Sequence, residues 1–321
     1  MGKVQTNFLK FHDNIKLDNF DENQALRDKR DMLIEELESL KSEDLPDGSG
    51  KFSFETKNQG SYSTFTGIKP LNDSDYDIDV ALIFDFNKNI YEDPTKLKVK
   101  IHDVLNSVYK RTVKIKEPCV TVEYPKFHVD LPCYAKNESG DLYLARGKEF
   151  SDAENKKWEQ ADPEGLKDYI NNTITTGNQR DQFRRVVKYI KLWKNKKITD
   201  FSVPSIGLTI FTIKNFQYSE DNDLGALANV LSLMVLNFKV SCSVSLPVAP
   251  NTDTFAKLTE SQKKSFIEKL EKFSEQIKSI ESLTSELDAI SQLNKIFGDD
   301  FPCENNPQKT ARPYTSSGSH A

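Results

Sequence analysis

Apolar and polar residues alternate in several short runs of the first half of the chain. In residues 76–86, Ile78, Val80 and Leu82 alternate with Asp77, Asp79 and Ala81. This period of two is typical of a strand with one buried face. The same alternation recurs in residues 51–61 and in two short runs of residues 119–135 that meet near Pro125. The first half of the chain is therefore predicted to form a β-sheet.

Apolar residues at intervals of three and four predict helices in the remaining segments. Two of these lie in the first half, over residues 7–41 and 95–111. The second half is predicted to be almost entirely helical, over residues 163–175, 179–197, 204–217, 224–238 and 256–297, the last as one helix or two. The fold class is therefore α+β, with a mixed sheet lobe packed on a helical lobe.

The sequence predicts two lobes and a tail. Residues 1–160, with the N-terminal helix, are assigned to the sheet lobe, and residues 161–303 to the helical lobe. No stretch rich in glycine, serine or proline separates the two, so they are expected to pack without a flexible linker. Residues 304–321 have no apolar periodicity and are predicted to be a disordered tail.

Composition narrows the classes of protein. Of the 321 residues, 37% are hydrophobic and 29% are charged, as in globular proteins. No run reaches the ~18 apolar residues of a membrane helix, so no membrane span is expected. The net charge of −5 argues against coating of nucleic acid through bulk charge. The four widely spaced cysteines fit free thiols in a reducing, cytoplasmic setting.

Carboxylates on the predicted strands point to a metal site. Asp77 and Asp79 stand two residues apart, so their side chains share a strand face about 6–7 Å apart. Two like charges this close require a compensating cation, and a hard divalent cation prefers oxygen ligands. Asp130, at the end of a later strand, is the best third carboxylate for a two-metal site. Weaker candidates are Glu123, Asp75 and Asp85.

A Gly-Ser pair precedes these carboxylates. Gly60 has no Cβ, so its backbone is able to approach a phosphate closely. Ser61 adds a hydroxyl and a backbone N–H. The pair and the carboxylates therefore predict a site in which a phosphate chain binds the turn and metal ions bridge it to the strand.

The stretch "GSYSTFTGIKPLNDSDYDIDVAL", followed by "KFHVDL", resembles nucleotidyltransferases of the DNA polymerase β type. Within that superfamily it is similar to the bacterial cGAS/DncV-like nucleotidyltransferases (CD-NTases), whose G-S-x-x-x-x-T-x-I pattern Thr66 and Ile68 fit. The helical segments "FRRVVKYIKLWKNK" and "FSVPSIGLTIFTIKNF" resemble the helix pair of the same family. The resemblance spans about residues 50–300.

The resemblance implies roles for individual residues. The metal ligands, for two Mg²⁺ ions with Mn²⁺ as the alternative, are Asp77, Asp79 and Asp130. The residues that bind the donor nucleotide are Gly60, Ser61, Lys188 and Ser205. The helix count leaves Lys191 and Arg184 as alternatives to Lys188, because each lies about one turn from Lys188. The tyrosine that follows this serine in the family is replaced by Ile206.

The resemblance implies an Mg²⁺-dependent enzyme that makes a cyclic di- or trinucleotide second messenger from NTPs such as ATP and GTP in antiphage (CBASS-type) defence. The alternatives are synthesis of linear 2′-5′ oligonucleotides and nucleotidyl transfer to RNA or protein. An inactive nucleotide-binding module would need a broken set of carboxylates, whereas all three are present. The implied partners are NTPs, an effector that responds to the product, and a ubiquitin-ligase-like enzyme that conjugates the tail ending in Ala321.

Overall fold

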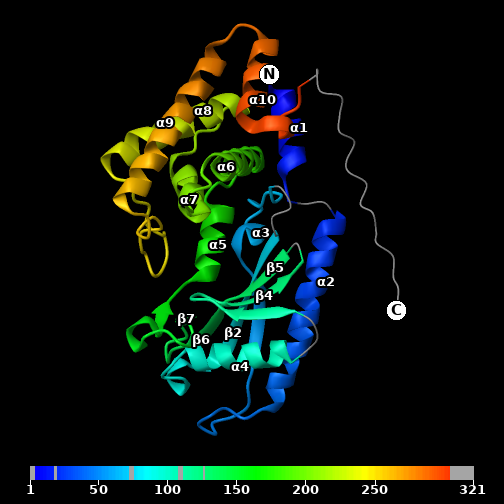
Figure 1. The fold of residues 1–321 in the computed structure, drawn as a ribbon, viewed down its shortest axis with the longest axis vertical. Helices are drawn as coiled ribbons and strands as arrows, with labels where there is room; N and C mark the ends of the chain where they lie inside the picture. Colours follow the sequence, from blue (N-terminus) through cyan, green and yellow to red (C-terminus); the bar gives the residue numbers. More distant parts are fainter. Residues whose placement is uncertain (1–3, 18–19, 72–75, 108–110, 126, 304–321) are drawn as a thin grey trace.

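The computed structural model describes residues 4–17, 20–71, 76–107, 111–125 and 127–303. It confirms the α+β prediction: a mixed sheet with its own helices lies below a bundle of helices (Figure 1). We call these two parts the sheet lobe, from α2 to β8, and the helical lobe, from α5 to α10 together with α1. The predicted tail, residues 304–321, lies outside the described residues.

The sheet has eight strands in the order β3-β4-β5-β2-β6-β7-β8, and β1 pairs with β2 outside that path. Their bounds are β1 Phe54–Asn58, β2 Tyr76–Asn87, β3 Thr112–Ile115, β4 Val120–Tyr124, β5 Phe127–Leu131, β6 Cys133–Lys136, β7 Leu142–Arg146 and β8 Lys157–Gln160. The central strand β2 runs parallel to β5 and β6, and the other pairs are antiparallel. The sequence analysis missed β3, β7 and β8.

The two faces of β2 differ, as its alternation predicts. Ile78, Val80 and Leu82 point into a core that they share with Val129 of β5. The helices α2 (Phe20–Leu37) and α4 (Thr95–Asn106) cover this core. The opposite face carries the acidic positions of β2 and, further along, Ala81, which packs in a small separate cluster. The acidic positions therefore lie on the face away from the main core of the sheet lobe.

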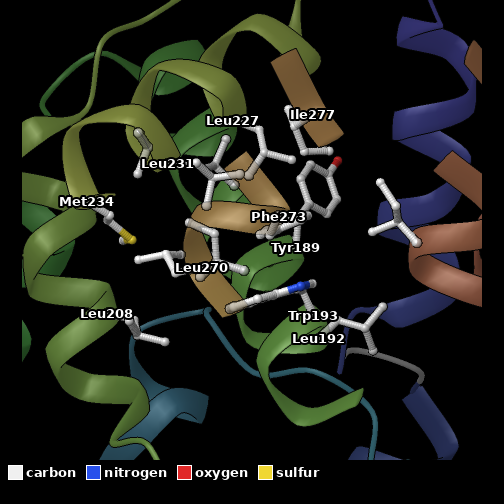
Figure 2. Packing of buried hydrophobic residues seen from close by; sticks show 14 of the residues in the cluster. Tyr189, Leu192, Trp193, Leu208, Leu227, Leu231, Met234, Leu270, Phe273 and Ile277 are labelled. Atoms are coloured by element: carbon white, nitrogen blue, oxygen red, sulfur yellow. The ribbon is translucent and has the colours of Figure 1, made fainter. Parts of the chain in front are cut away.

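The helical lobe is built around one large apolar core (Figure 2), and a smaller cluster lies between α5, α6 and α7. Its helices are α5 Pro163–Asn172, α6 Gly177–Lys197, α7 Ser205–Asn215, α8 Asp223–Val240, α9 Glu260–Ser282 and α10 Glu286–Phe297. Trp193 of α6 stacks on Phe273 of α9, with ring centroids 4.5 Å apart and planes 7° apart. The predicted segment 256–297 is two helices, and the second begins where the Ser285 side chain accepts from the Asp288 amide.

The prediction of one helix over residues 7–41 is wrong. The structure has α1 (Gln5–Ile15) in the helical lobe and α2 (Phe20–Leu37) in the sheet lobe (Figure 1). Phe8 and Phe11 of α1 are fully buried in the helical core, so α1 does not belong to the sheet lobe, where residues 1–160 were all expected. Apolar residues recur at helical spacing in both segments, so the periodicity predicts helix throughout. It does not show that the two segments pack in different cores.

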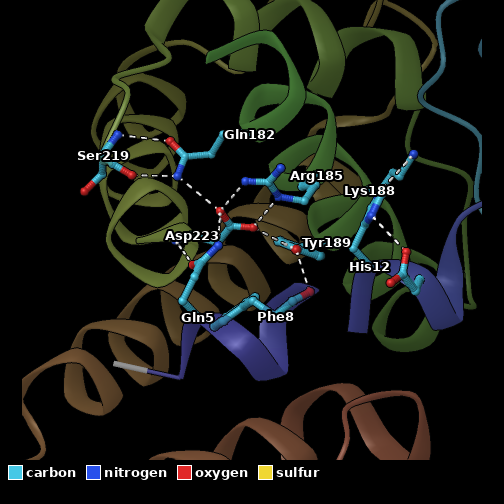
Figure 3. Close-up of polar contacts among 10 residues, drawn as sticks. Gln5, Phe8, His12, Gln182, Arg185, Lys188, Tyr189, Ser219 and Asp223 are labelled. Carbon is cyan, nitrogen blue, oxygen red and sulfur yellow. Dashed lines mark hydrogen bonds and ion pairs between the residues drawn. The ribbon is translucent and has the colours of Figure 1, made fainter. Parts of the chain in front are cut away.

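A buried carboxylate fixes α1 to the helical lobe. Asp223, at the start of α8, accepts hydrogen bonds from Arg185, Gln182 and Tyr189 of α6 and from the Gln5 side chain of α1 (Figure 3). The Asp223 amide donates in turn to Gln5 Oε1 at 2.7 Å. Burial alone would raise the pKa of Asp223, but the hydrogen bonds and charge of Arg185 outweigh it and lower the pKa.

The helix α8 is long and apolar enough to span a bilayer by length and composition. In this structure it packs against α6, α7 and α9, and its apolar residues Leu227, Leu231 and Met234 are fully buried in the helical core (Figure 2). It is therefore accounted for as the core helix of this lobe.

Candidate active site

The turn after β1 brings the Gly-Ser pair against the acidic face of β2. The Gln59 amide donates to the Asp79 carbonyl at 2.8 Å, and the short helix α3 (Gly60–Ser63) begins at once. Gly60 has a φ of +66°, and a β-carbon there would lie 1.9 Å from Oδ2 of Asp79. Only glycine fits this position, because both the positive φ and the close approach exclude a side chain.

Two of the predicted metal ligands stand side by side. Asp79 of β2 and Asp130 of β5 are directly paired in the parallel register of these strands. Their neighbours Ile78, Val80 and Val129 all point into the core of the sheet lobe, so the two carboxylates project together from the opposite face. The fold thus brings together two residues, Asp79 and Asp130, that the sequence analysis named as candidate metal ligands.

Asp130 is held at one oxygen. Thr121 Oγ1 donates to Asp130 Oδ1 at 2.5 Å, and Lys116 Nζ lies 3.7 Å from the same oxygen. Burial, with a further contribution from the Asp130 charge, raises the pKa of the nearby Cys119 thiol to about 12. Both Asp130 contacts leave Oδ2 for another partner.

The residues fit a hard divalent cation. Asp79 and Asp130 offer carboxylate oxygens on one face, and the missing side chain of Gly60 leaves the space that the Asp79 carboxylate occupies. The backbone of Asp77 lies two residues before Asp79 in β2 and pairs with His128, but its side chain lies outside the described structure. Among the described side chains, no group of three His, Cys, Asp or Glu residues forms a metal cluster.

The buried Lys191 and the half-buried Lys194 of α6 face the Gly-Ser turn from the helical lobe. Lys191 Nζ donates to the Thr66 carbonyl at 2.9 Å and to Thr66 Oγ1 at 3.1 Å. Lys194 Nζ donates to the Ser205 hydroxyl at 2.8 Å and to the Val203 carbonyl at 3.2 Å. Burial lowers the pKa of Lys191 to about 7 and that of Lys194 to about 8.

These groups border a continuous opening between the lobes, which we call the interlobe cleft. It comprises two cavities of about 870 and 400 Å³ that share Ser61, Lys191 and Ser205 as lining residues. The smaller cavity is also lined by Gly60 and Asp79, and the larger by Lys194. The contacts described for the two lysines are to hydroxyls and carbonyls, so their positive charge is not neutralised there by a carboxylate. The cleft therefore suits a multiply charged anion.

The structure places Lys188 away from this cleft. Its Nζ lies 3.1 Å from Nε2 of His12 on α1 (Figure 3), and it is not among the residues that line either cavity. Burial, reinforced by the Lys188 charge, lowers the pKa of His12 to about 4, so the neutral ring accepts from the lysine. The face of α6 that carries Lys188 is covered by α1. Lys191, the alternative from the helix count, reaches the cleft instead, and Lys194 is the lining residue that the sequence analysis missed.

The two remaining predictions for the helical lobe have different outcomes. Ser205 is the first residue of α7 and lines both cavities. Ile206 lines the smaller cavity, where the family has a tyrosine. Arg184 lies with its guanidinium 4.5 Å from the ring centroid of the exposed Phe65, and it lines neither cavity.

Comparison of the sequence with known proteins relates this site to a protein family. The family model for the nucleotidyltransferase domain of DncV-like cyclic GMP-AMP synthases matches residues 54–134, which hold the Gly-Ser turn and all three carboxylates. Over these residues, about a quarter of its length, the chain is similar to the bacterial cGAS/DncV-like nucleotidyltransferases. A cyclic GMP-AMP synthase of Escherichia albertii is 29% identical over 177 residues, which cover 51% of this chain and 38% of that protein. The chain thus aligns with well under half of this relative.

Other members of the cGAS/DncV-like family match over a longer stretch. A cyclic AMP-AMP-AMP synthase of an Acinetobacter strain is 21% identical over 253 residues, 76% of this chain and 71% of that protein. The structure of Vibrio cholerae DncV with the linear intermediate pppA(3′,5′)pG superposes with a TM-score of 0.66 at 19% identity, over 78% of this chain and 71% of that one. The DncV complex with nonhydrolyzable GTP gives 0.65. These likenesses show that the bilobed fold is that of DncV.

Proposed function

We propose that this protein is a metal-dependent nucleotidyltransferase that joins nucleoside triphosphates into a cyclic di- or trinucleotide. The observation that carries the proposal is the composition of the interlobe cleft. Asp79, which pairs with Asp130 of the neighbouring strand, lines one side, and the buried Lys191 and half-buried Lys194 line the other. This arrangement suits a triphosphate between metal-binding carboxylates and phosphate-binding lysines.

The residues divide the work of binding the donor nucleotide. The Gly60–Ser61 turn lies directly beside Asp79, where it is able to hold the terminal phosphates against the strand. Lys191 and Lys194 neutralise phosphate charge from the opposite wall, and we assign them the role that the sequence analysis gave to Lys188. Ser205, at the first turn of α7, adds a hydroxyl and backbone amide to the same anion.

Asp77, Asp79 and Asp130 would hold two Mg²⁺ ions, with Mn²⁺ as the alternative. When bound, such ions neutralise the phosphates and orient an in-line attack of a ribose hydroxyl on the α-phosphate, with pyrophosphate as the leaving group. Since Thr121 and Lys116 both contact Oδ1 of Asp130, we assign Oδ2 as the atom that accepts the proton of the hydroxyl. Thr121 thereby keeps that carboxylate in one orientation.

The relatives support a cyclic product. One is named a cyclic GMP-AMP synthase and the other a cyclic AMP-AMP-AMP synthase, so the family contains both two- and three-membered rings. The test is incubation with labelled NTPs and Mg²⁺, with and without phosphatase, followed by mass spectrometry. A ring resists phosphatase and shows its bases by mass. A phosphatase-sensitive oligomer would overturn ring closure and favour a linear 2′-5′ product, whereas label on RNA or protein would favour the other alternative.

A messenger role extends the same proposal. A cyclic nucleotide made in the cytoplasm would act on an effector in CBASS-type antiphage defence, and residues 304–321 would be the site of conjugation by a ubiquitin-ligase-like partner. Deletion of residues 316–321 tests whether conjugation requires the tail while catalysis does not. Catalysis by the purified protein is expected to persist, and conjugates are expected to vanish when the neighbouring genes are co-expressed. Conjugates that survive the deletion would contradict the tail assignment.

A further inference from the structure

A second basic cavity lies within the helical lobe, between α6, α9 and α10. Its volume is about 510 Å³, within the usual range of ligand pockets. Four lysines from three helices line it: Lys197 of α6, Lys269 and Lys272 of α9, and Lys295 of α10. No acidic residue lines it in the part of the chain that the structure describes. This cavity shares no lining residue with the interlobe cleft.

The charge of this cavity is largely uncompensated. Lys269 pairs with Asp200 at 3.0 Å, but Lys197, Lys272 and Lys295 have no carboxylate partner among the described residues. The chain as a whole carries a net charge of −5, so this group of cations is a local feature and not a reflection of a basic protein. Like charges gathered around one cavity repel each other, and a multivalent anion between them relieves that repulsion.

The floor of the cavity is rigid and apolar. Trp193 is 3% exposed and is fixed by its stacking on Phe273, and Ile280 and Ile296 lie beside it. Gln276 and Gln292 add amide donors at the rim. A preformed floor with convergent donors lowers the ordering cost of binding.

We propose that this cavity binds a small anion that carries a chain of phosphates. Phosphates match the group of lysines because each oxygen accepts from an ammonium group, and a chain spans cations that come from three helices. A nucleoside triphosphate and inorganic polyphosphate share this chemistry. The site is separate from the proposed donor site, and it does not depend on the assignment of the catalytic reaction.

The cavity is joined to the interlobe cleft through one ion pair. Asp200, the partner of Lys269, lies in the connection between α6 and α7 and lines the larger cavity of the cleft. Phe201 lines the same cavity, and Lys269 lies 5.6 Å from its ring centroid. An anion bound to Lys269 competes with Asp200 for this lysine. Binding in the second cavity would therefore affect a residue that lines the interlobe cleft.

The test measures tripolyphosphate binding by calorimetry to the full-length protein. Wild type is compared with Lys272→Gln/Lys295→Gln, and the matched control is Lys278→Gln, an exposed lysine of α9 outside the cavity. All of these lysines are exposed, so the variants are expected to fold. The double variant should bind about tenfold more weakly or worse, because charge-assisted hydrogen bonds are lost. The control should stay within about twofold of wild type.

Two results would overturn the proposal. Tripolyphosphate that binds only in the interlobe cleft would bind the double variant as tightly as wild type. An equal loss in Lys278→Gln would show general attraction to a basic surface. Asp200→Asn gives a further check, made in both the wild-type and the Lys272→Gln/Lys295→Gln backgrounds because Asp200 also lines the interlobe cleft: the loss of the carboxylate that competes for Lys269 should tighten binding by about threefold in the wild-type background only, and weaker binding there would contradict the site.

The two sources of the phosphate chain are separated by a tryptophan signal. The chain has two tryptophans, so Trp158→Phe leaves Trp193 as the only indole, on the floor of the cavity. Saturating tripolyphosphate and ATP are both expected to change its emission, and a larger change or tighter binding with ATP would identify a nucleotide. Emission that neither ligand changes would contradict binding at this site.

Discussion

Gly60 and Asp79 approach each other so closely that a β-carbon at residue 60 would lie 1.9 Å from Oδ2 of the aspartate. The position of the Asp79 carboxylate therefore depends on the absence of a side chain at residue 60. Gly60→Ala is expected to displace Asp79 and to reduce nucleotidyl transfer by about a hundredfold or more. The measurement is the initial rate of pyrophosphate release.

The control for this change is Gly48→Ala. Gly48 has a similar φ of +70°, and a β-carbon there would meet no atom within 4 Å. Both variants carry the backbone strain of a positive φ, about 1–2 kcal/mol. Only Gly60→Ala also meets a carboxylate, so equal loss of activity in the two variants would contradict the role of the close approach.

Asp130→Asn tests the carboxylate pair. The change keeps the shape and the oxygen that accepts from Thr121, but it removes the charge beside Asp79. We expect turnover to fall by about a thousandfold while the protein remains folded, because a metal ligand and proton acceptor are lost together. Asp85→Asn is the matched control, since Asp85 lies on the same strand as Asp79 but is exposed and paired with Lys136. Retained activity in Asp130→Asn would refute the assignment.

The buried Lys191 predicts a stability that rises with pH. Burial lowers the pKa of Lys191 from 10.5 to about 7, so between these values the unfolded chain binds more protons than the folded one. The free energy of unfolding therefore increases as pH rises through this range. From pH 7 to pH 9 the wild type should gain about 2 kcal/mol relative to Lys191→Met, measured by urea denaturation.

Lys194→Met provides a graded comparison. The pKa of Lys194 is about 8, closer to its ordinary value, so the corresponding gain should be only about 1 kcal/mol. A pH dependence that is the same in wild type and both variants would show that neither ammonium is destabilised by burial.

Asp223→Ala should destabilise the helical lobe. The aspartate is fully buried, and its removal leaves the Arg185 charge and the Tyr189 and Gln182 donors without their acceptor. We expect a loss of about 3–5 kcal/mol in urea denaturation, with the amides of α1 exchanging faster. Asp13→Ala, which breaks an exposed pair with Lys16 on α1, should change stability by less than about 1 kcal/mol. Similar losses in the two variants would contradict a special role for Asp223.

The sequence is sufficient to predict one half of the cleft. The period of two along β2 and β5 determines which face carries Asp79 and Asp130, because a shift by one residue would bury carboxylates in the core. Gly60 is predictable because close backbone approach requires a residue without a side chain. The strands β3, β7 and β8 are harder to predict, since each has four or five residues and little apolar alternation.

The other half of the cleft depends on packing that the helix count does not contain. Lys188 and Lys191 lie within one turn of α6, and the docking of α1 against Lys188 decides which of them faces the Gly-Ser turn. That docking rests on contacts between residues more than 170 positions apart, such as His12 with Lys188. Such long-range contacts cannot be predicted from the spacing of apolar residues within one segment.

The separation of α1 from α2 has a consequence for biosynthesis. Two of the ring partners of Phe8 and Phe11, the rings of Phe297 and Phe301, are translated nearly 300 residues after them. The sheet lobe is complete well before that, so it is expected to fold while α1 still waits for its core. A nascent chain halted between α8 and α10 would therefore have Tyr189 against the two rings of α1 but lack Phe297 and Phe301, and so would leave part of these rings uncovered even with its sheet fully formed.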